Sequence, residues 1–230
     1  MAIEDESNEE KFRWIALAHP LTSDMIQAAD QIRQQLKVWQ ASDQALLLLR
    51  KSLPGFSFEE VLLKAVTINA LYRTNVYAIW KAAENLHRLL KDTDPENVDV
   101  DHVEQMAMIP DINKRFTSFA SKFAHFFIGK RFPIKDKYAE RTILYHLGRG
   151  KWEKHLGKPY EEFVENFRKL KDSCEFNCSI REFDQYLWLA GLFREWEKKK
   201  DKAQINKEAR GFFEDVNNEE ILQRAFEGGL

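Results

Sequence analysis

Residues 116–143 read FTSFASKFAHFFIGKRFPIKDKYAERTI, and this stretch decides the expected fold class. Four phenylalanines recur at the spacings of three and four that mark one face of an α-helix: Phe116, Phe119, Phe123 and Phe126. Gly129 ends the pattern, and Pro133 restrains the residue before it to an extended conformation. Asp136 then stands where it can cap a second helix through about residue 147. The stretch predicts a helix, a short extended connection and another helix.

The helical period continues through most of the chain. Helices are expected at 22–40, 42–49, 57–71, 76–86, 102–108, 116–128, 136–147, 159–172 and 179–200, followed by two short amphipathic stretches. Leu53-Pro54-Gly55 is a stop signal, and Ser57 with Glu60 forms a capping box. No segment shows the alternation of a strand, and nine glycines and six prolines are few. The sequence predicts an all-α fold with a single globular helical domain.

The ends of the chain differ from its middle in composition. Residues 1–11 are acidic and are expected to be disordered, residues 12–200 to form the helical domain, and residues 201–230 a charged helical tail. An acidic start is unlike a signal peptide, and the apolar runs are too short for a bilayer. Cys174 and Cys178 have no partner motif. We therefore expect a cytoplasmic protein that contacts no membrane and carries no metal or cofactor.

Charge is unevenly distributed along the chain. Residues 113–159 contain twelve Lys and Arg against three Asp and Glu, a net charge of +9, which leaves −11 for the remainder. Such segregation is typical of phosphate binding, although an ordinary solvated surface is the alternative. DNA is therefore the expected partner. The candidate contacts in and near this segment are Lys114, Arg115, Lys130, Arg131, Lys135, Lys137 and Arg141.

A polar stripe follows the flank of the phenylalanine seam, formed by Arg115, Ser118, Lys122 and His125. On the flank, the amine of Lys122 can be partly buried, and burial lowers the pKa of a lysine. A lysine with a lowered pKa is a usable nucleophile. The alternative is that Lys122 extends its amine to water, as most flank lysines do.

Asp136 is the second candidate for chemistry. The first N–H groups of a helix stabilise a carboxylate in its ionised form. A helix end, a turn and an extended segment separate Asp136 from Lys122, which is enough chain to double back and bring amine and carboxylate together. The alternative is that Asp136 serves only as a helix cap.

The stretch FASKFAHFFIGKRFPIKDKYAERTI resembles part of the helix-hairpin-helix DNA glycosylase superfamily. Lys122 matches the lysine that begins the second hairpin helix, and Asp136 matches the catalytic aspartate that begins the next helix. Phe132-Pro133-Ile134 matches the apolar residues before that aspartate. The resemblance implies a two-lobed helical arrangement and a catalytic Lys122–Asp136 pair.

A second match lies upstream, in VLLKAVTINALYRTNVYAIWKAAENL, which resembles the superfamily's first long helix, a polar break and the next helix. That break approaches DNA in the family. The residues that the resemblance would place near the site are Asn69, Arg73, Thr74 and Asn75. The two matches together cover roughly 50 of the 230 residues.

The chain departs from the family at the hairpin. The glycine-rich turn that grips phosphate is replaced by residues 114–118, KRFTS, so either Lys114 and Arg115 take over its contacts or the DNA grip is lost. A four-cysteine cluster is missing, which excludes an iron–sulfur cluster. Asp184 and Trp188, in REFDQYLWLAGL, are interpreted as core packing.

Two functions remain open at this stage. The resemblance implies a base-excision DNA N-glycosylase with AP-lyase activity that acts on a damaged or modified base. The alternative is a non-catalytic all-α module that binds nucleic acid or protein, in which Lys122 and Asp136 form a structural ion pair.

Overall fold

The computed structural model describes residues 17–148 and 159–226, and the regular structure in these two ranges is helical. The α-helices are α1 Ser23–Arg33, α2 Lys37–Ser52, α3 Phe58–Tyr72, α4 Ile79–Leu90, α5 Val100–Ala107, α6 Thr117–Phe123, α7 Lys137–His146, α8 Pro159–Asp172, α9 Ile180–Lys199, α10 Lys207–Glu214 and α11 Glu219–Phe226. Pairing of extended backbone in the described ranges is limited to one isolated bridge, between Met108 and Arg115. The all-α prediction is confirmed.

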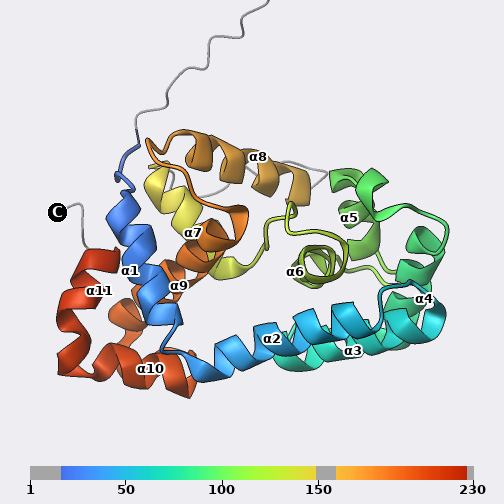
Figure 1. Ribbon diagram of the computed structural model, residues 1–230, viewed down its shortest axis with the longest axis horizontal. Helices are drawn as coiled ribbons and strands as arrows, with labels where there is room; N and C mark the ends of the chain where they lie inside the picture. Colours follow the sequence, from blue (N-terminus) through green and yellow to red (C-terminus); the bar gives the residue numbers. More distant parts are fainter. Residues whose placement is uncertain (1–16, 149–158, 227–230) are drawn as a thin grey trace, which may run out of the picture.

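The helices gather around α6, which is seen end-on near the centre of Figure 1. The long helices α2 and α3 pack side by side beneath it, and α4 and α5 complete that side of the molecule. On the other side α9 packs against α7 and α1, and α1 packs against α11. Helix α8 contacts α5, α6 and α7, so it joins the two sides.

Helix starts follow the capping signals of the sequence. Ser57 and Glu60 form the expected capping box at the start of α3, and Ser179 with Glu182 forms another at the start of α9. Asp136 caps α7 with its side chain, as expected. Local hydrogen bonds of this kind need only residues within one turn of each other, which is why the sequence predicts them.

The expected helix over 22–40 and the short helix beginning at Ser42 are both wrong. The chain breaks after Arg33, and α2 then runs unbroken from Lys37 to Ser52. Inside α2 the Ser42 hydroxyl donates to the Val38 carbonyl at 2.9 Å. The physical reason is distant in sequence, because the Glu208 carboxylate of α10 accepts from the Val38 N–H at 3.0 and 3.2 Å and so caps the start of α2.

The phenylalanine-rich helix changes its winding halfway. After α6 the backbone forms a π-helical turn over Ala124–Ile128, in which the Gly129 N–H donates to the Ala124 carbonyl at 2.9 Å. Arg50 of α2 donates to the Ile128 carbonyl at 3.1 Å and so satisfies the end of the turn. The predicted seam is confirmed, since its four phenylalanines are all buried. Turns of this kind are rare and are frequent at functional sites.

The last two helices pack against the first part of the chain. Phe193 of α9 contacts Phe213 of α10 and Phe226 of α11, with ring centroids 5.3 and 4.7 Å apart. Arg224 of α11 pairs with Asp24 of α1 at 2.6 Å. Apolar contacts and an ion pair thus attach the segment expected to be a charged tail to α1 and α9.

Some predictions lie outside the described residues. These are the disordered segment 1–11 and four basic residues of the +9 segment, Arg149, Lys151, Lys154 and Lys158. Among the helices of the two described ranges, none combines the length and the apolar character needed to cross a membrane.

Candidate functional site

The extended segment Phe132–Lys135 is held by buried side chains in place of a neighbouring strand. The ring of His125, in the π-helical turn, donates from Nδ1 to the Phe132 carbonyl at 2.8 Å. The hydroxyl of Tyr160, in α8, donates to the Pro133 carbonyl at 2.9 Å. Burial lowers the pKa of His125 to about 4, so the ring is neutral near pH 7 and its proton lies on the nitrogen that faces the carbonyl.

Two further side chains hold the second half of the segment. The Asp184 carboxylate of α9 accepts from the Ile134 N–H with both oxygens, at 3.1 and 3.2 Å. The Ser121 hydroxyl of α6 accepts from the Lys135 N–H at 3.0 Å. Side chains from four different elements therefore fix the backbone that leads into Asp136, which predisposes this carboxylate to one position.

Asp136 uses one carboxylate oxygen for the fold. Its Oδ1 accepts from the N–H groups of Tyr138 and Ala139, both at 2.9 Å. Within the described residues Oδ2 accepts no hydrogen bond, and the side chain is half-buried. The carboxylate is thus anchored through Oδ1, while Oδ2 is not engaged by any hydrogen bond from the described residues.

Lys122 is buried, and the interpretation that its amine extends to water is wrong. The residue is 5% exposed, and its Nζ donates to the Ser118 hydroxyl at 2.7 Å and lies 5.8 Å from the centre of the Tyr72 ring. Burial lowers the pKa of the Lys122 amine, and the negative charges of Asp136 and Asp184 oppose this effect. The amine has the environment that tunes a lysine toward nucleophilic chemistry.

Lys122 and Asp136 interact through space. Among the ion pairs of the described residues none joins the two side chains directly, and the amine instead donates to its own helix, to the hydroxyl and carbonyl of Ser118. The structure therefore places the predicted pair in one electrostatic environment without the direct contact of a structural salt bridge.

Asp184 lies among the charged and polar groups around Lys122. Its sequence pattern indicates only a core-packing residue, and the structure adds these polar contacts. Asp184 is buried, which raises its pKa well above the ordinary range, while Arg181, the Ile134 N–H and Lys122 act in the opposite direction. Its Oδ2 lies 3.7 Å from His125 Nδ1. The available signal was its spacing, since Asp184 precedes Leu187 and Gly191 by three and seven residues and so shares their buried face.

A third carboxylate closes the cluster. Asp43 of α2 is buried and accepts from the hydroxyl of Tyr72, which ends α3, and from the guanidinium of Arg181 in α9. Ion pairs of this kind inside a protein need such complete hydrogen bonding to offset desolvation. We call these residues the Lys122 cluster: Lys122, Asp136, Asp184, Asp43, Tyr72 and Arg181.

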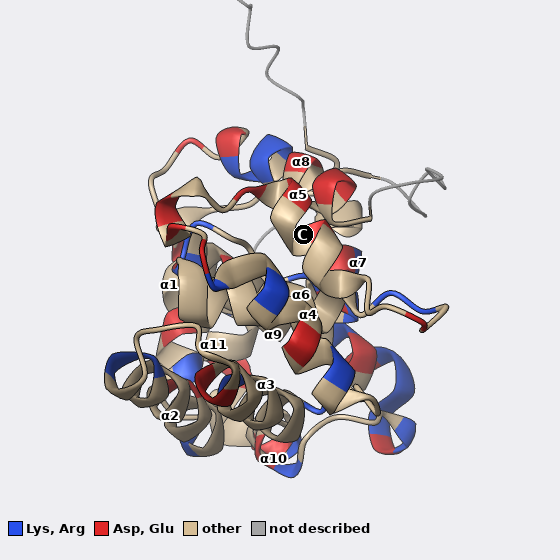
Figure 2. Ribbon diagram, turned by 90° about the vertical axis from the view of Figure 1, so that its right-hand side faces the viewer, with Lys and Arg blue, Asp and Glu red and all other residues tan. Residues whose placement is uncertain are grey.

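The predicted DNA-contacting residues are only partly free. Ion pairs to the chain's own acids engage four of them: Arg115 with Glu104, Arg131 with Glu96, Lys135 with Glu140 and Arg141 with Glu195. Figure 2 shows Lys and Arg interspersed with Asp and Glu over the face it presents. In the described ranges Lys114, Lys130 and Lys137 are exposed and form no ion pair. The +9 segment is thus partly neutralised by acids, three of which the fold brings from outside it.

The break between α3 and α4 carries the remaining candidates. Arg73 and Asn75 are exposed and have φ values of 47° and 56°, in the left-handed region that few side chains adopt. The Asn69 side chain accepts from the Thr74 hydroxyl at 2.9 Å and from the Val76 N–H at 3.0 Å. This break follows directly on Tyr72, so it adjoins the Lys122 cluster along the chain.

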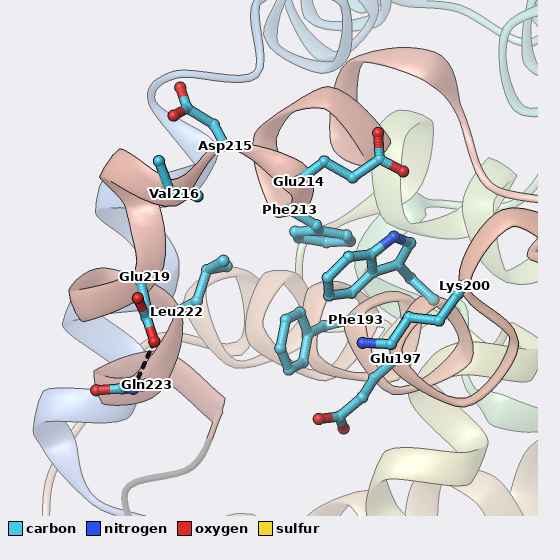
Figure 3. A pocket seen from close by; sticks show the side chains of 11 residues that line it. Phe193, Glu197, Lys200, Phe213, Glu214, Asp215, Val216, Glu219, Leu222 and Gln223 are labelled. Carbon is cyan, nitrogen blue, oxygen red and sulfur yellow. Dashed lines mark hydrogen bonds between the residues drawn. The ribbon is translucent and has the colours of Figure 1, made fainter.

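A pocket of about 260 Å³ lies elsewhere, among α9, α10 and α11 (Figure 3). Its walls are aromatic and acidic, and the ammonium of Lys200 lies 4.2 Å from the ring centre of Trp196. Phe193, which lines it, is nine residues beyond Asp184 on α9, or about 14 Å along the helix axis. This pocket therefore does not open onto the Lys122 cluster. In the described ranges no three His, Cys, Asp or Glu side chains gather in a metal-binding group.

Comparison with known proteins identifies relatives of undescribed function. Residues 22–131 match the family HI_0787_N, described as an N-terminal domain, and this range includes Lys122 but ends before Asp136. A protein of Haemophilus influenzae, named only as uncharacterized, is 33% identical over 144 residues, which cover 59% of this chain and 68% of the relative. No solved structure matches the chain.

Proposed function

The chain belongs to the same family as the uncharacterized Haemophilus influenzae protein, and we propose that it is a DNA glycosylase-like base-excision enzyme with lyase activity. One observation carries the proposal: a buried lysine amine shares its environment with a carboxylate whose position is fixed and whose Oδ2 is available. The resemblance of residues 119–143 to the helix-hairpin-helix glycosylases supports the same two residues.

The proposed reaction begins when the enzyme extrudes a damaged nucleotide from the helix stack. The neutral amine of Lys122 adds to the sugar C1′ while the bond to the base breaks. The base leaves with that bond's electron pair and takes up a proton from water. Asp136 stabilises the developing sugar cation, accepts a proton from the new ammonium and returns it to the ring oxygen as the ring opens. The resulting protonated imine acidifies C2′, and loss of that proton expels the 3′ phosphate.

We also propose that the helices form two lobes of the glycosylase kind. Contacts among α2, α3, α4, α5 and α6 support one lobe, and contacts among α1, α7, α9 and α11 support the other. Members of the Lys122 cluster come from both groups, because Lys122 lies on α6 while Asp184 lies on α9. A base would then enter between the lobes.

The test is borohydride trapping of the full chain on a panel of duplexes that each carry one damaged base or an abasic site. A covalent protein–DNA adduct on at least one duplex, which disappears in Lys122→Gln, is the expected result. Absence of any adduct from the folded wild-type protein across the panel would overturn the proposal.

The second candidate, a non-catalytic nucleic-acid- or protein-binding module, is favoured by the burial of Lys122 at 5% exposure. In that case the cluster holds the two groups of helices together and the exposed Lys114, Lys130 and Lys137 contact phosphate. DNA affinity should then fall steeply with salt, and charge reversal at Lys130 should lower the salt slope by about one. The matched control is Arg141→Glu, since Arg141 already pairs with Glu195.

A further inference from the structure

We propose that Asp184 is the positioning residue of the site: it holds the backbone that presents Asp136, and its carboxylate sets the balance between the protonated and neutral forms of the Lys122 amine. The inference rests on the proposed function for its catalytic meaning. Its physical content, a link between one buried carboxylate, one backbone amide and one amine, can be measured without any activity.

The mechanical part of the argument starts from Ile134. Its N–H lies in an extended segment where no strand in the described ranges can pair with it, and a buried N–H without a partner destabilises the folded state. Both oxygens of Asp184 accept from this N–H. Because Asp136 lies only two residues further along, the position of α9 is transmitted through Asp184 to the candidate catalytic carboxylate.

The close packing of α7 on α9 supports the same connection. A side-chain carbon added at Gly191 would lie 2.4 Å from the Tyr138 carbonyl oxygen, so the helices touch backbone to backbone. The Thr142 hydroxyl of α7 also donates to the Leu187 carbonyl of α9 at 2.9 Å. Helix α9 therefore contacts α7 directly, through its backbone at Gly191 and Leu187, and it binds the segment before α7 through Asp184.

The electrostatic part concerns Lys122. The charged and titratable groups that face its amine are Asp136 at the start of α7, Asp184 of α9 and Tyr72 of α3, and its direct hydrogen bonds go to Ser118. Asp184 is itself faced by Arg181, His125, Asp136 and Tyr160. A negative charge at Asp184 favours the protonated amine, so its removal should lower the pKa of Lys122 further.

Asp184→Asn separates the two roles, because asparagine keeps an oxygen that can accept from Ile134 and loses the charge. We would label the full chain with ¹³C-lysine, assign the Lys122 Cε signal by its loss in Lys122→Gln, and titrate it with pH. The Lys122 pKa should fall by about one unit or more in Asp184→Asn, while hydrogen exchange at the Ile134 amide stays slow. In Asp184→Ala exchange at Ile134 should accelerate at least about tenfold, since the acceptor is gone.

Lys64 provides the internal control. It is also buried and titrates in the same spectra, but its charged neighbours are Glu60 and Arg50, so its pKa should not move in Asp184→Asn. An unchanged Lys122 titration in Asp184→Asn would overturn the electrostatic role, and unchanged exchange at Ile134 in Asp184→Ala would overturn the mechanical one. If Asp184→Ala does not fold, the Lys122 titration in Asp184→Asn still tests the electrostatic role.

The same variants separate this inference from the proposed function. If the wild-type protein traps DNA, its pH profile should move toward lower pH in Asp184→Asn, because the amine becomes neutral earlier. If no duplex is trapped, the catalytic proposal fails, but the nuclear magnetic resonance titration still tests the link from Asp184 to Lys122.

Discussion

Two buried lysines on neighbouring helices, Lys64 and Lys122, both face an aromatic ring and carboxylate charge, and the use that the fold makes of those carboxylates differs. Lys64 is 1% exposed and lies 4.5 Å from the ring centre of Phe56 and 5.6 Å from that of Phe127. Its amine donates to the Gly55 carbonyl. Burial lowers the pKa of both amines, and each is opposed by carboxylate charge.

The difference lies in the carboxylates. The Glu60 carboxylate, beside Lys64, accepts from the Gly55 N–H with one oxygen and from the Ser57 N–H with the other, so both of its oxygens are engaged. Asp136, beside Lys122, gives only one oxygen to its helix. On the proposed function, we therefore expect the second Asp136 oxygen, which accepts no hydrogen bond from the described residues, and not burial alone, to distinguish the Lys122 cluster from the Lys64 site.

The largest expected effect is the loss of trapping in Lys122→Gln. Removal of the nucleophile should reduce borohydride adduct to background, with DNA binding and folding retained. Lys64→Gln should do the reverse, with adduct formation retained and a stability loss of about 1–3 kcal/mol in urea unfolding, because a buried donor is altered. Equal effects of the two substitutions on trapping would erase the distinction between the lysines.

The next effect concerns the two carboxylates. Asp136→Asn should slow base excision in single-turnover assays by about 10²–10⁴-fold, the range typical of a proton-transfer group, because the amide cannot carry the proton. Helix capping should survive, since asparagine caps as well as aspartate. Glu60→Gln keeps one oxygen for the Ser57 N–H of the capping box and loses the hydrogen bond from the Gly55 N–H, and it should leave the excision rate within about twofold. A slow Glu60→Gln variant would show that these assays report stability only.

Protonation of His125, in the π-helical turn that follows Lys122, should lower the stability of the folded protein at acid pH. The pKa of this ring is about 4 when folded and 6.5 ordinarily, so the folded state prefers the neutral ring. The stability that follows is present above pH 6.5 and is lost as pH falls toward 4, by about 2–3 kcal/mol at pH 4.5. Urea unfolding at pH 7.0 and 4.5 should show this loss of stability. In His125→Asn the difference in stability between the two pH values should be smaller by about 2–3 kcal/mol. His146, whose pKa is also lowered to about 4, should still contribute its share in that variant.

The smallest expected effect tests how α9 holds α7. Gly191→Ala places a carbon against the Tyr138 carbonyl and should cost about 1–3 kcal/mol of stability through overpacking. Gly211→Ala, in α10, meets nothing within 4 Å and should stabilise the protein by about 0.5–1 kcal/mol. In Gly191→Ala the Lys122 signal should shift and the Lys64 signal should stay. A shift of both would mean that α9 supports the two regions alike.

Helix class and most helix ends could be predicted from the sequence because they depend on neighbours within one or two turns. The capping boxes at Ser57 and Ser179, the stop at Pro54 and the cap at Asp136 are hydrogen bonds or steric restrictions of that range. The phenylalanine seam was predictable for the same reason, since a period of three to four residues reports one helix face.

Other features were decided only by contacts between distant residues. The start of α2 depends on Glu208, which is 170 positions away from Val38, so the apolar period alone placed the break between the two helices near residue 41 and not after Arg33. Arg141 is occupied by Glu195, 54 positions away, which no count of charges along the chain reveals.

The candidate site divides in the same way. Lys122 and Asp136 were predictable, because a flank lysine and a capping aspartate are local patterns. Asp184 reaches Ile134 across 50 positions, and Arg181 reaches Asp43 across 138, so their roles depend on how α9 packs. Local hydrogen bonds depend on residues that are adjacent in the sequence. The electrostatic potential at a buried amine is the sum of contributions from every element packed around it, so it is set only when the chain folds.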